Sequence, residues 1–130
     1  MENKISEFSD KCVIFKISSK RIRDKGIYGA VRWAWHANLN RVRNADYVLA
    51  VEIGTGGRVV GIFKPILWYK ATSENDKKYE HFLNAGGTEE NEKRIAFKGV
   101  EVNDELLKRK YKYIPKELLG QANPVRYLNC

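Results

Sequence analysis

The segment Asp46-Tyr-Val-Leu-Ala-Val-Glu-Ile53 is followed by Gly54-Thr-Gly-Gly57 and then by Arg58-Val-Val-Gly-Ile-Phe63. Both outer runs are rich in β-branched and aromatic residues, which favour strands, and the glycines between them favour a tight turn. We therefore predict a β-hairpin at this place. The glycine-rich turn also resembles a phosphate-binding loop in composition, but such loops precede a helix, whereas this one precedes a strand.

The second strand of the hairpin is expected to continue past Pro65 to Ala71. Because proline has no backbone N–H, its position predicts a bulge, a bend or a sheet edge. After Ala71 the chain turns polar, which predicts a long loop over residues 72–93 with one short helix around 77–83. The other expected elements are strands over 11–18, 94–102 and 124–128, and helices over 25–37, over 105–111 with Asn103 or Asp104 as cap, and from Pro115 to Gly120.

This order of elements predicts the fold class. Several strands with one dominant hairpin favour an α+β protein built on a small curved mixed sheet or a β-barrel with short flanking helices. The chain has 130 residues, and no repeat or low-complexity tract divides it. We therefore expect a single domain over residues 1–130.

The predicted helix over residues 25–37 is amphipathic, and Asp24 is placed to cap its N-terminus. Its apolar residues recur at helical spacing and form one stripe, made of Ile27, Ala30, Val31, Ala34 and Trp35. We expect Trp35 in the core. Arg32, Trp33 and His36 fall on the opposite face, so Trp33 is expected to point outward.

The composition is that of a globular protein, with 43% hydrophobic and 12% aromatic residues. No apolar run reaches the ~18 residues of a membrane span, and the N-terminal residues lack the apolar core of a secretory signal. We expect a soluble cytoplasmic protein. Cys12 and Cys130 have no cysteine partner at metal-ligand spacing, and we expect both to be free thiols.

Positive charge is the first indication of function. Lys and Arg total 24 against 16 Asp and Glu, which gives a net charge of +8 at pH 7. Such a charge attracts polyanions, with nucleic acid as the first expectation and an anionic membrane surface as the second. We expect nucleic acid as the partner, either RNA or DNA, and no membrane.

Residues 32–43 carry cations, amides and an indole, the groups that contact phosphates, base edges and base faces. Further along, Trp68 and Tyr69 are adjacent in a predicted strand, so one of them is expected outside or lining a pocket. Arg41, Arg43 and Lys64 are expected on phosphates, and Trp33 and Trp68 on bases. The complete set of candidate nucleic-acid-binding residues is Arg32, Trp33, His36, Asn38, Asn40, Arg41, Arg43, Lys64, Trp68 and Tyr69.

Two other functions stay open. A small metal-dependent nuclease would use carboxylates, but Asp46 and Glu52 end up about 20 Å apart in an extended strand. A transferase would use the 72–93 loop as a lid, and His36 and His81 lack an evident nucleophile. We assign no catalytic residue, metal ligand or cofactor. The third hypothesis, beside nucleic-acid binding and an enzyme, is a protein-interaction domain with Trp33 and Trp68 as anchors for a partner chain.

The order of pieces over residues 11–71 resembles the PUA-like superfamily, which includes the PUA, ASCH, EVE, YTH and SRA domains. The resemblance lies in a strand, a helix with Trp33-Ala-Trp35, the run Asp46-Tyr-Val-Leu-Ala-Val51, and a glycine turn into Val59-Val-Gly-Ile-Phe-Lys64. It implies a small barrel that binds RNA or a modified or flipped base in DNA. On that resemblance Trp33, Trp68 and Tyr69 would form the walls of a base pocket, and Asn38 or Asn40 would read the base edge. The polar residues 72–93 depart from the pattern.

Overall fold

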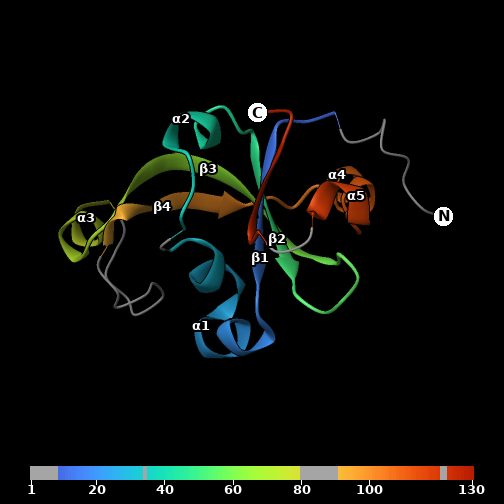
Figure 1. Ribbon diagram of the computed structural model, residues 1–130, viewed down its shortest axis with the longest axis horizontal. Helices are drawn as coiled ribbons and strands as arrows, with labels where there is room; N and C mark the ends of the chain where they lie inside the picture. Colours follow the sequence, from blue (N-terminus) through green and yellow to red (C-terminus); the bar gives the residue numbers. More distant parts are fainter. Residues whose placement is uncertain (1–8, 34, 80–90, 121–122) are drawn as a thin grey trace.

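The computed structural model describes residues 9–33, 35–79, 91–120 and 123–130, with the backbone alone at 73, 76, 79 and 91–93. Its strands are β1 (Cys12–Ile17), β2 (Tyr47–Glu52), β3 (Val59–Ala71), β4 (Asn91–Glu101) and β5 (Val125–Leu128). They form one mixed sheet in the order β4-β3-β2-β1-β5 (Figure 1). The β1–β2 pair is parallel, and the other neighbouring pairs are antiparallel.

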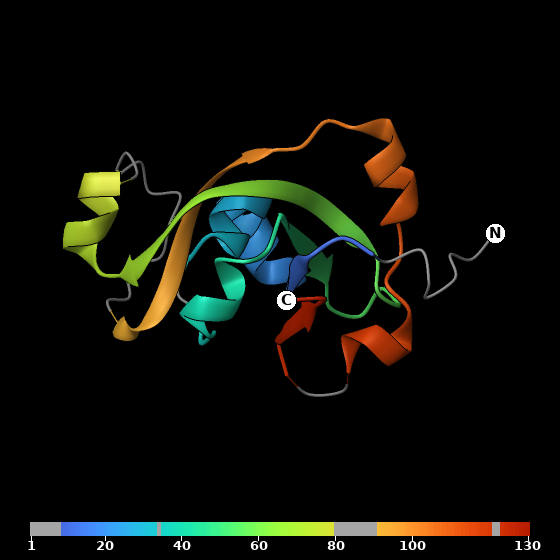
Figure 2. The ribbon, with the colours of Figure 1, turned by 90° about the horizontal axis from the view of Figure 1, so that it is seen from above.

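Among the described residues, five short helices flank this sheet: α1 (Ser19–Val31), α2 (Leu39–Val42), α3 (Ser73–Tyr79), α4 (Glu105–Lys110) and α5 (Lys116–Leu119). The parallel β1–β2 pair needs a crossover, and α1 and α2 provide it. α2 lies on one side of β1 and β2, and α4 and α5 lie on the other (Figure 1). Seen from above, β3 is long and curved and carries α3 at the end opposite α4 (Figure 2).

β1 is buried on both faces, and its alternating side chains divide the interior into two cores. Val13, Phe15 and Ile17 enter the first core, together with apolar residues of α1 and α2. Cys12 and Ile14 enter the second core, which residues of α4, α5 and their connection cover. At the centre of the first core, the rings of Phe15 and Trp35 are stacked with centroids 4.4 Å apart. Trp35 is thus in the core, as predicted.

The predicted helix over 25–37 is wrong in its limits. α1 begins at Ser19, where Ser18 rather than Asp24 is the cap and accepts a hydrogen bond from the Arg21 backbone N–H. It passes Gly26 in a non-helical conformation and ends at Val31. Beyond that point the chain pairs with the free edge of β4, and those interstrand hydrogen bonds replace the helical ones. The Ala34 position of the predicted stripe lies outside the described residues.

That pairing uses three backbone hydrogen bonds. Trp35 and Ile95 exchange two of them, at 2.8 and 2.9 Å, and the Phe97 N–H donates a third to the Arg32 carbonyl at 2.9 Å. An open edge of β4 is therefore covered by the chain itself, as sheet edges in soluble proteins usually are. The pairing also explains why the helix does not continue through Arg32 and Trp35.

The predicted hairpin is confirmed, because β2 and β3 are antiparallel neighbours joined by the glycine turn. β3 reaches Ala71 as expected, and its register with β4 shifts between Pro65 and Leu67, which is the bulge that Pro65 predicts. The helices at α4, with Asp104 as cap, and at α5, between Pro115 and Gly120, are also confirmed. The predicted short helix at 77–83 is instead α3 at residues 73–79, and residues 80–90 lie outside the described part.

The α+β class with a mixed sheet is confirmed, and among the described residues the sheet is open, since β4 and β5 do not pair. Cys12 and Cys130 are free thiols, as expected, and the Cys130 Sγ lies 3.4 Å from the Cys12 carbonyl oxygen. Within the described ranges, no helix combines the length and the hydropathy that a membrane crossing requires.

The hairpin turn docks against the connection between α4 and α5, and Gly57 makes this contact possible. Gly57 has φ of 92°, and a Cβ built there would lie 2.4 Å from the Ile114 carbonyl oxygen. The same backbone approach allows the Ile114 N–H to donate to the Gly57 carbonyl at 2.8 Å. Gly54 has φ of 87° but faces open space.

We therefore expect Gly57→Ala to destabilise the protein more than Gly54→Ala. Both variants force alanine into the left-handed region, at about 1–2 kcal/mol each, and Gly57→Ala adds a backbone clash of about 1–3 kcal/mol. Urea denaturation of the two variants measures the difference. Equal losses in the free energy of unfolding would show that the turn does not dock as described.

Candidate nucleic-acid interface

Four of the candidate residues are buried: Arg32, Trp33, Trp68 and Tyr69. The prediction that Trp33 faces outward is wrong, because only 1% of it is exposed. The chain turns along β4 after α1, which places the Trp33 ring in a small core with Tyr69, Ala71 and Ala96. In this conformation Trp33 cannot stack on a base or anchor a partner chain.

The expectation that Trp68 or Tyr69 lies outside or lines a pocket is also wrong, because both faces of β3 are covered there. Trp68 packs in the first core, 5.1 Å from the ring of Phe97. Tyr69 lies on the opposite face, and its hydroxyl accepts a hydrogen bond from Arg32 Nη2 at 2.8 Å. The Arg32 guanidinium also lies 5.2 Å from the Trp33 ring centroid. Arg32, Trp33 and Tyr69 thus hold the segment after α1 to the sheet.

The other six candidates are exposed: His36, Asn38, Asn40, Arg41, Arg43 and Lys64. Lys64 does not join the rest. It follows Phe63, whose side chain is in the first core, so Lys64 points to the opposite face of β3, next to Val100 of β4. The remaining five lie on the segment that leads into α2, on α2 itself and, for Arg43, at its C-cap.

Asn38 has a structural role that its position in the sequence explains. Its side-chain oxygen accepts from the Arg41 N–H at 3.2 Å and caps α2. Its backbone N–H donates to the Tyr127 hydroxyl at 2.8 Å. Asn38 therefore sets the start of α2 and holds it next to β5.

Arg41 makes the contact that defines this surface. Its guanidinium lies 3.8 Å from the centroid of the Tyr127 ring. Its Nε and Nη2 donate to the Cys130 carbonyl oxygen at 3.0 and 2.7 Å. A guanidinium has five N–H donors, so others stay available on this exposed side chain. Arg41 is thereby held in one orientation at the surface.

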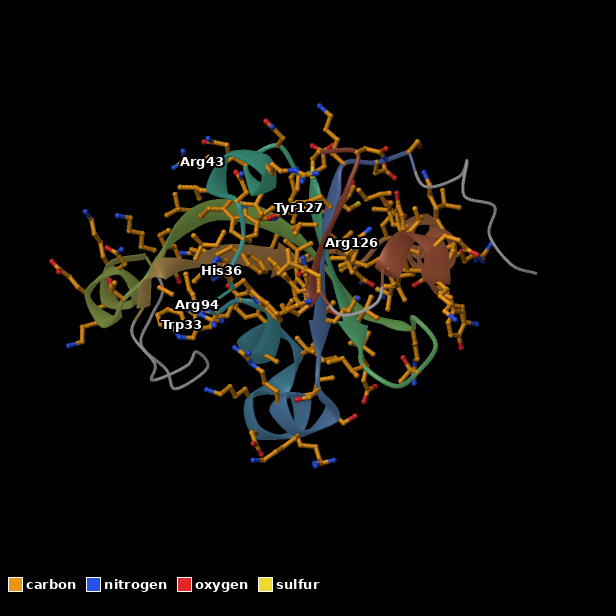
Figure 3. The ribbon with its side chains drawn as sticks, viewed as in Figure 1. Trp33, His36, Arg43, Arg94, Arg126 and Tyr127 are labelled. Carbon is orange, nitrogen blue, oxygen red and sulfur yellow. The ribbon has the colours of Figure 1, made fainter. Side chains whose placement is uncertain are left out.

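Tyr127 is the residue that sequence reasoning missed. Tyr127 falls in the strand predicted over 124–128. Because side chains alternate along a strand, Tyr127 and Arg126 are expected on opposite faces of it. No local signal indicated that the strand would lie next to α2. We call the surface formed by His36, Asn38, Asn40, Arg41, Arg43 and Tyr127 the α2–β5 face. Figure 3 shows His36, Arg43 and Tyr127 on the same side of the molecule, with Arg94 below.

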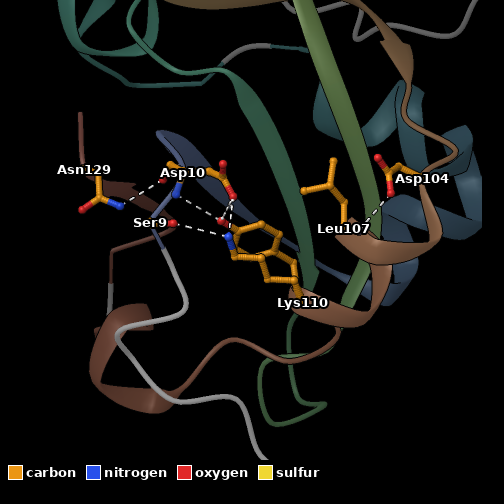
Figure 4. Close-up of polar contacts among 7 residues, drawn as sticks. Ser9, Asp10, Asp104, Leu107, Lys110 and Asn129 are labelled. Carbon is orange, nitrogen blue, oxygen red and sulfur yellow. Dashed lines mark hydrogen bonds and ion pairs between the residues drawn. The ribbon is translucent and has the colours of Figure 1, made fainter.

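A second polar cluster lies around Asp10, at the start of β1 (Figure 4). Asp10 Oδ2 accepts from the Tyr111 hydroxyl at 2.5 Å and from Lys110 Nζ at 3.0 Å. The Asn129 side-chain amide donates to the Asp10 carbonyl at 3.0 Å. The cluster joins the segment before β1 to α4 and to the residues after β5.

These contacts change the titration of the groups involved. The hydrogen bond from Tyr111 and the charge of Lys110 lower the pKa of Asp10, against the effect of burial. Burial, together with the Asp10 hydrogen bond, raises the pKa of Tyr111. Burial also raises the pKa of Cys12 to about 12, so at neutral pH Cys12 is a thiol rather than a nucleophilic thiolate. The contacts of the Asp10 cluster therefore hold segments of the chain together, and we assign no catalytic role to them.

The carboxylates considered for a nuclease do not converge. Asp46 precedes β2 and Glu52 ends it, so they lie at opposite ends of the strand. Glu52 accepts a hydrogen bond from the Ser19 hydroxyl at 2.6 Å. Within the described part of the chain, no three His, Cys, Asp or Glu side chains are grouped to hold a metal ion. His81 lies outside the described residues.

A hollow of about 400 Å³ lies elsewhere, between the start of β3, the end of β4 and the C-terminal end of α4. Its charged lining is of mixed sign, with Lys108, Arg109 and Lys112 opposed by Glu101. Lys108 is already bonded to the Asn103 side chain at 2.8 Å. Lys108 also lies 3.8 Å from the Glu105 carboxylate, so Glu101 and Glu105 offset part of the positive charge around the hollow.

No protein-family model, no curated protein and no solved structure matches this chain. The PUA-like resemblance therefore stays a prediction.

The structural role of the Asp10 cluster can be tested by substitution of Asp10. Asp10→Asn is expected to lower the free energy of unfolding by about 1–2 kcal/mol at pH 7, because a charged hydrogen-bond acceptor is lost. Since the pKa of Asp10 is lowered in the folded state, its contribution is present above the unfolded pKa of about 4 and is lost as the pH falls through the folded value.

Denaturation of wild type and Asp10→Asn between pH 7 and acid should thus give curves that converge at low pH. Asp24→Asn, at an exposed position of α1, is the matched control and should show no such convergence. A pH-independent difference for Asp10→Asn would contradict the assignment.

Proposed function

We propose that this protein is a nucleic-acid-binding domain and that the α2–β5 face is its contact surface. The net charge of +8 supports a polyanionic partner. The arrangement of Arg41 on Tyr127 carries the proposal, because it presents a rigid, exposed guanidinium in the middle of the face. The PUA-like resemblance further suggests which nucleic acid is bound: RNA, or a base flipped out of DNA.

Arg41 supplies both of the contacts that nucleic acid requires. One planar face of its guanidinium lies against Tyr127, and a base stacks on the other face as bases do on arginine planes in RNA complexes. The N–H groups not engaged by Cys130 bind phosphate oxygens in the fork geometry of arginine. The stacking role expected for Trp33 and Trp68 is thereby transferred to the Arg41–Tyr127 pair.

The neighbouring side chains complete the surface. Arg43 is exposed one residue beyond the end of α2 and adds a second phosphate contact. Asn40 on α2 and His36 on the segment before it are exposed and have donors and acceptors suited to base edges. We propose binding rather than catalysis, because the thiol of Cys12 is buried and the carboxylates of Asp46 and Glu52 are far apart.

Binding is measured by fluorescence polarisation of labelled single-stranded RNA, single-stranded DNA and duplex DNA, from about 50 to about 300 mM salt. Arg41→Ala combined with Arg43→Ala is expected to weaken binding roughly tenfold or more. The slope of log affinity against log salt should fall by about two units, close to one per lost phosphate contact. The ligand that binds most tightly identifies the class of nucleic acid.

Lys64→Ala is the matched control, since it removes one exposed charge from the opposite face of β3. Its slope should stay close to that of wild type. An unchanged slope in the arginine variant with a reduced slope in Lys64→Ala would place the interface on the other side of the molecule. Absence of binding to all three ligands at low salt would refute the proposed function.

A further inference from the structure

The edge strand β5 has a second flank, opposite to that of Tyr127, and it carries two cations. Arg126 lies across from Ile14 in the antiparallel β1–β5 register, and Lys16 is two residues further along β1. The two side chains therefore share one face of the sheet as diagonal neighbours. Both are partly buried. Figure 3 shows Arg126 and Tyr127 on different sides of β5.

The backbone around α5 is shaped to hold the Arg126 guanidinium. Arg126 Nε donates to the Leu118 carbonyl at 3.4 Å. Gly120 lies so close that a Cβ built there would be 2.9 Å from Arg126 Cζ and 3.0 Å from its Nε and Nη1. Gly120 also has φ of 67°, which already favours glycine. The contacts with Leu118 and Gly120 fix the orientation of the Arg126 guanidinium, and therefore the direction in which its remaining N–H groups point.

Nothing in the described residues neutralises this pair. Among the described residues, neither Lys16 nor Arg126 forms an ion pair with a carboxylate. The lysines of α4 differ in this respect, since Lys108 pairs with Glu105 and Lys110 with Asp10. Burial and the nearby charge of Arg126 lower the pKa of Lys16. Two like charges held together in a partly desolvated place cost free energy unless an anion offsets them.

We infer that Lys16 and Arg126 bind a phosphate group. The fork of Arg126 suits two phosphate oxygens, and Lys16 supplies a point charge beside it. In the nucleic-acid form, this inference rests on the proposed function: a backbone that crosses the edge strand β5 places one phosphate on Arg41, a second on Arg43 and a further one on Lys16 and Arg126. A free phosphate group would use the same chemistry.

Two probes separate these sources: inorganic phosphate, and the single-stranded RNA and DNA used above. NMR titration of the wild type with inorganic phosphate is expected to shift the Lys16 amide and the Arg126 Nε–H signals saturably. Lys16→Met and Arg126→Met together should weaken phosphate binding at least tenfold. Lys98→Met removes an exposed lysine on β4 and should leave phosphate binding unchanged.

Stability provides a readout that a merely structural pair would not give. Because the two charges repel, Lys16→Met should leave the unfolding midpoint unchanged or raise it, whereas loss of a stabilising contact would lower it. Arg126→Lys keeps the charge without the fork and should bind phosphate with intermediate affinity. If Arg126→Met does not fold, Lys16→Met and Arg126→Lys are sufficient for the test.

The outcomes are distinct. Phosphate shifts at both residues, with an oligonucleotide salt slope about one unit lower in the double variant, support a phosphate site on the nucleic-acid path. Phosphate binding without any oligonucleotide binding supports the site and refutes the proposed function. Phosphate shifts absent from both residues, with oligonucleotide affinity and slope equal in wild type and double variant, overturn the inference.

Discussion

The pairing of Trp35 with Ile95 is the contact from which the rest of the architecture follows. Their two backbone hydrogen bonds attach the segment after α1 to the outer edge of β4. They bring Trp35 over Phe15, so the segment that is paired with β4 also packs on β1 in the first core. The cost of ordering this irregular segment is offset by the aromatic area it buries.

The same pairing explains the distribution of arginines and aromatics. Trp33 and Arg32 precede Trp35 and are drawn into the interior, where the guanidinium is bonded to Tyr69 rather than left uncompensated. A buried arginine requires such partners, because an isolated buried charge is very costly. The residues after Trp35 leave the sheet and form α2, where Arg41 and the C-cap residue Arg43 are exposed. One segment therefore supplies both core and surface.

β5 has cationic side chains beside both of its flanks. As an edge strand it alternates Tyr127 toward α2 and Arg126 toward α5, so Arg41 lies against one flank, and Arg126 and Lys16 of β1 lie on the other. The flanks differ in kind: Arg41 is held by an aromatic ring and a carbonyl, whereas Arg126 lies on a glycine backbone. The Asp10 cluster holds the start of β1 and the residues after β5 together, which keeps this edge in place.

The sequence by itself determined the features that adjacent residues encode. The glycine turn, the Pro65 bulge, the Asp104 cap and the Pro115–Gly120 helix all depend on local backbone preferences, and β1 and its neighbours follow from β-branched composition. The tertiary structure alone decided that Trp33 is buried. It alone also brought Arg41 into contact with Cys130, because these two residues are 89 positions apart in the sequence. It also decided the closeness of Lys16 and Arg126. Such contacts depend on strand order and edge pairing, and no local pattern specifies which distant segments become neighbours.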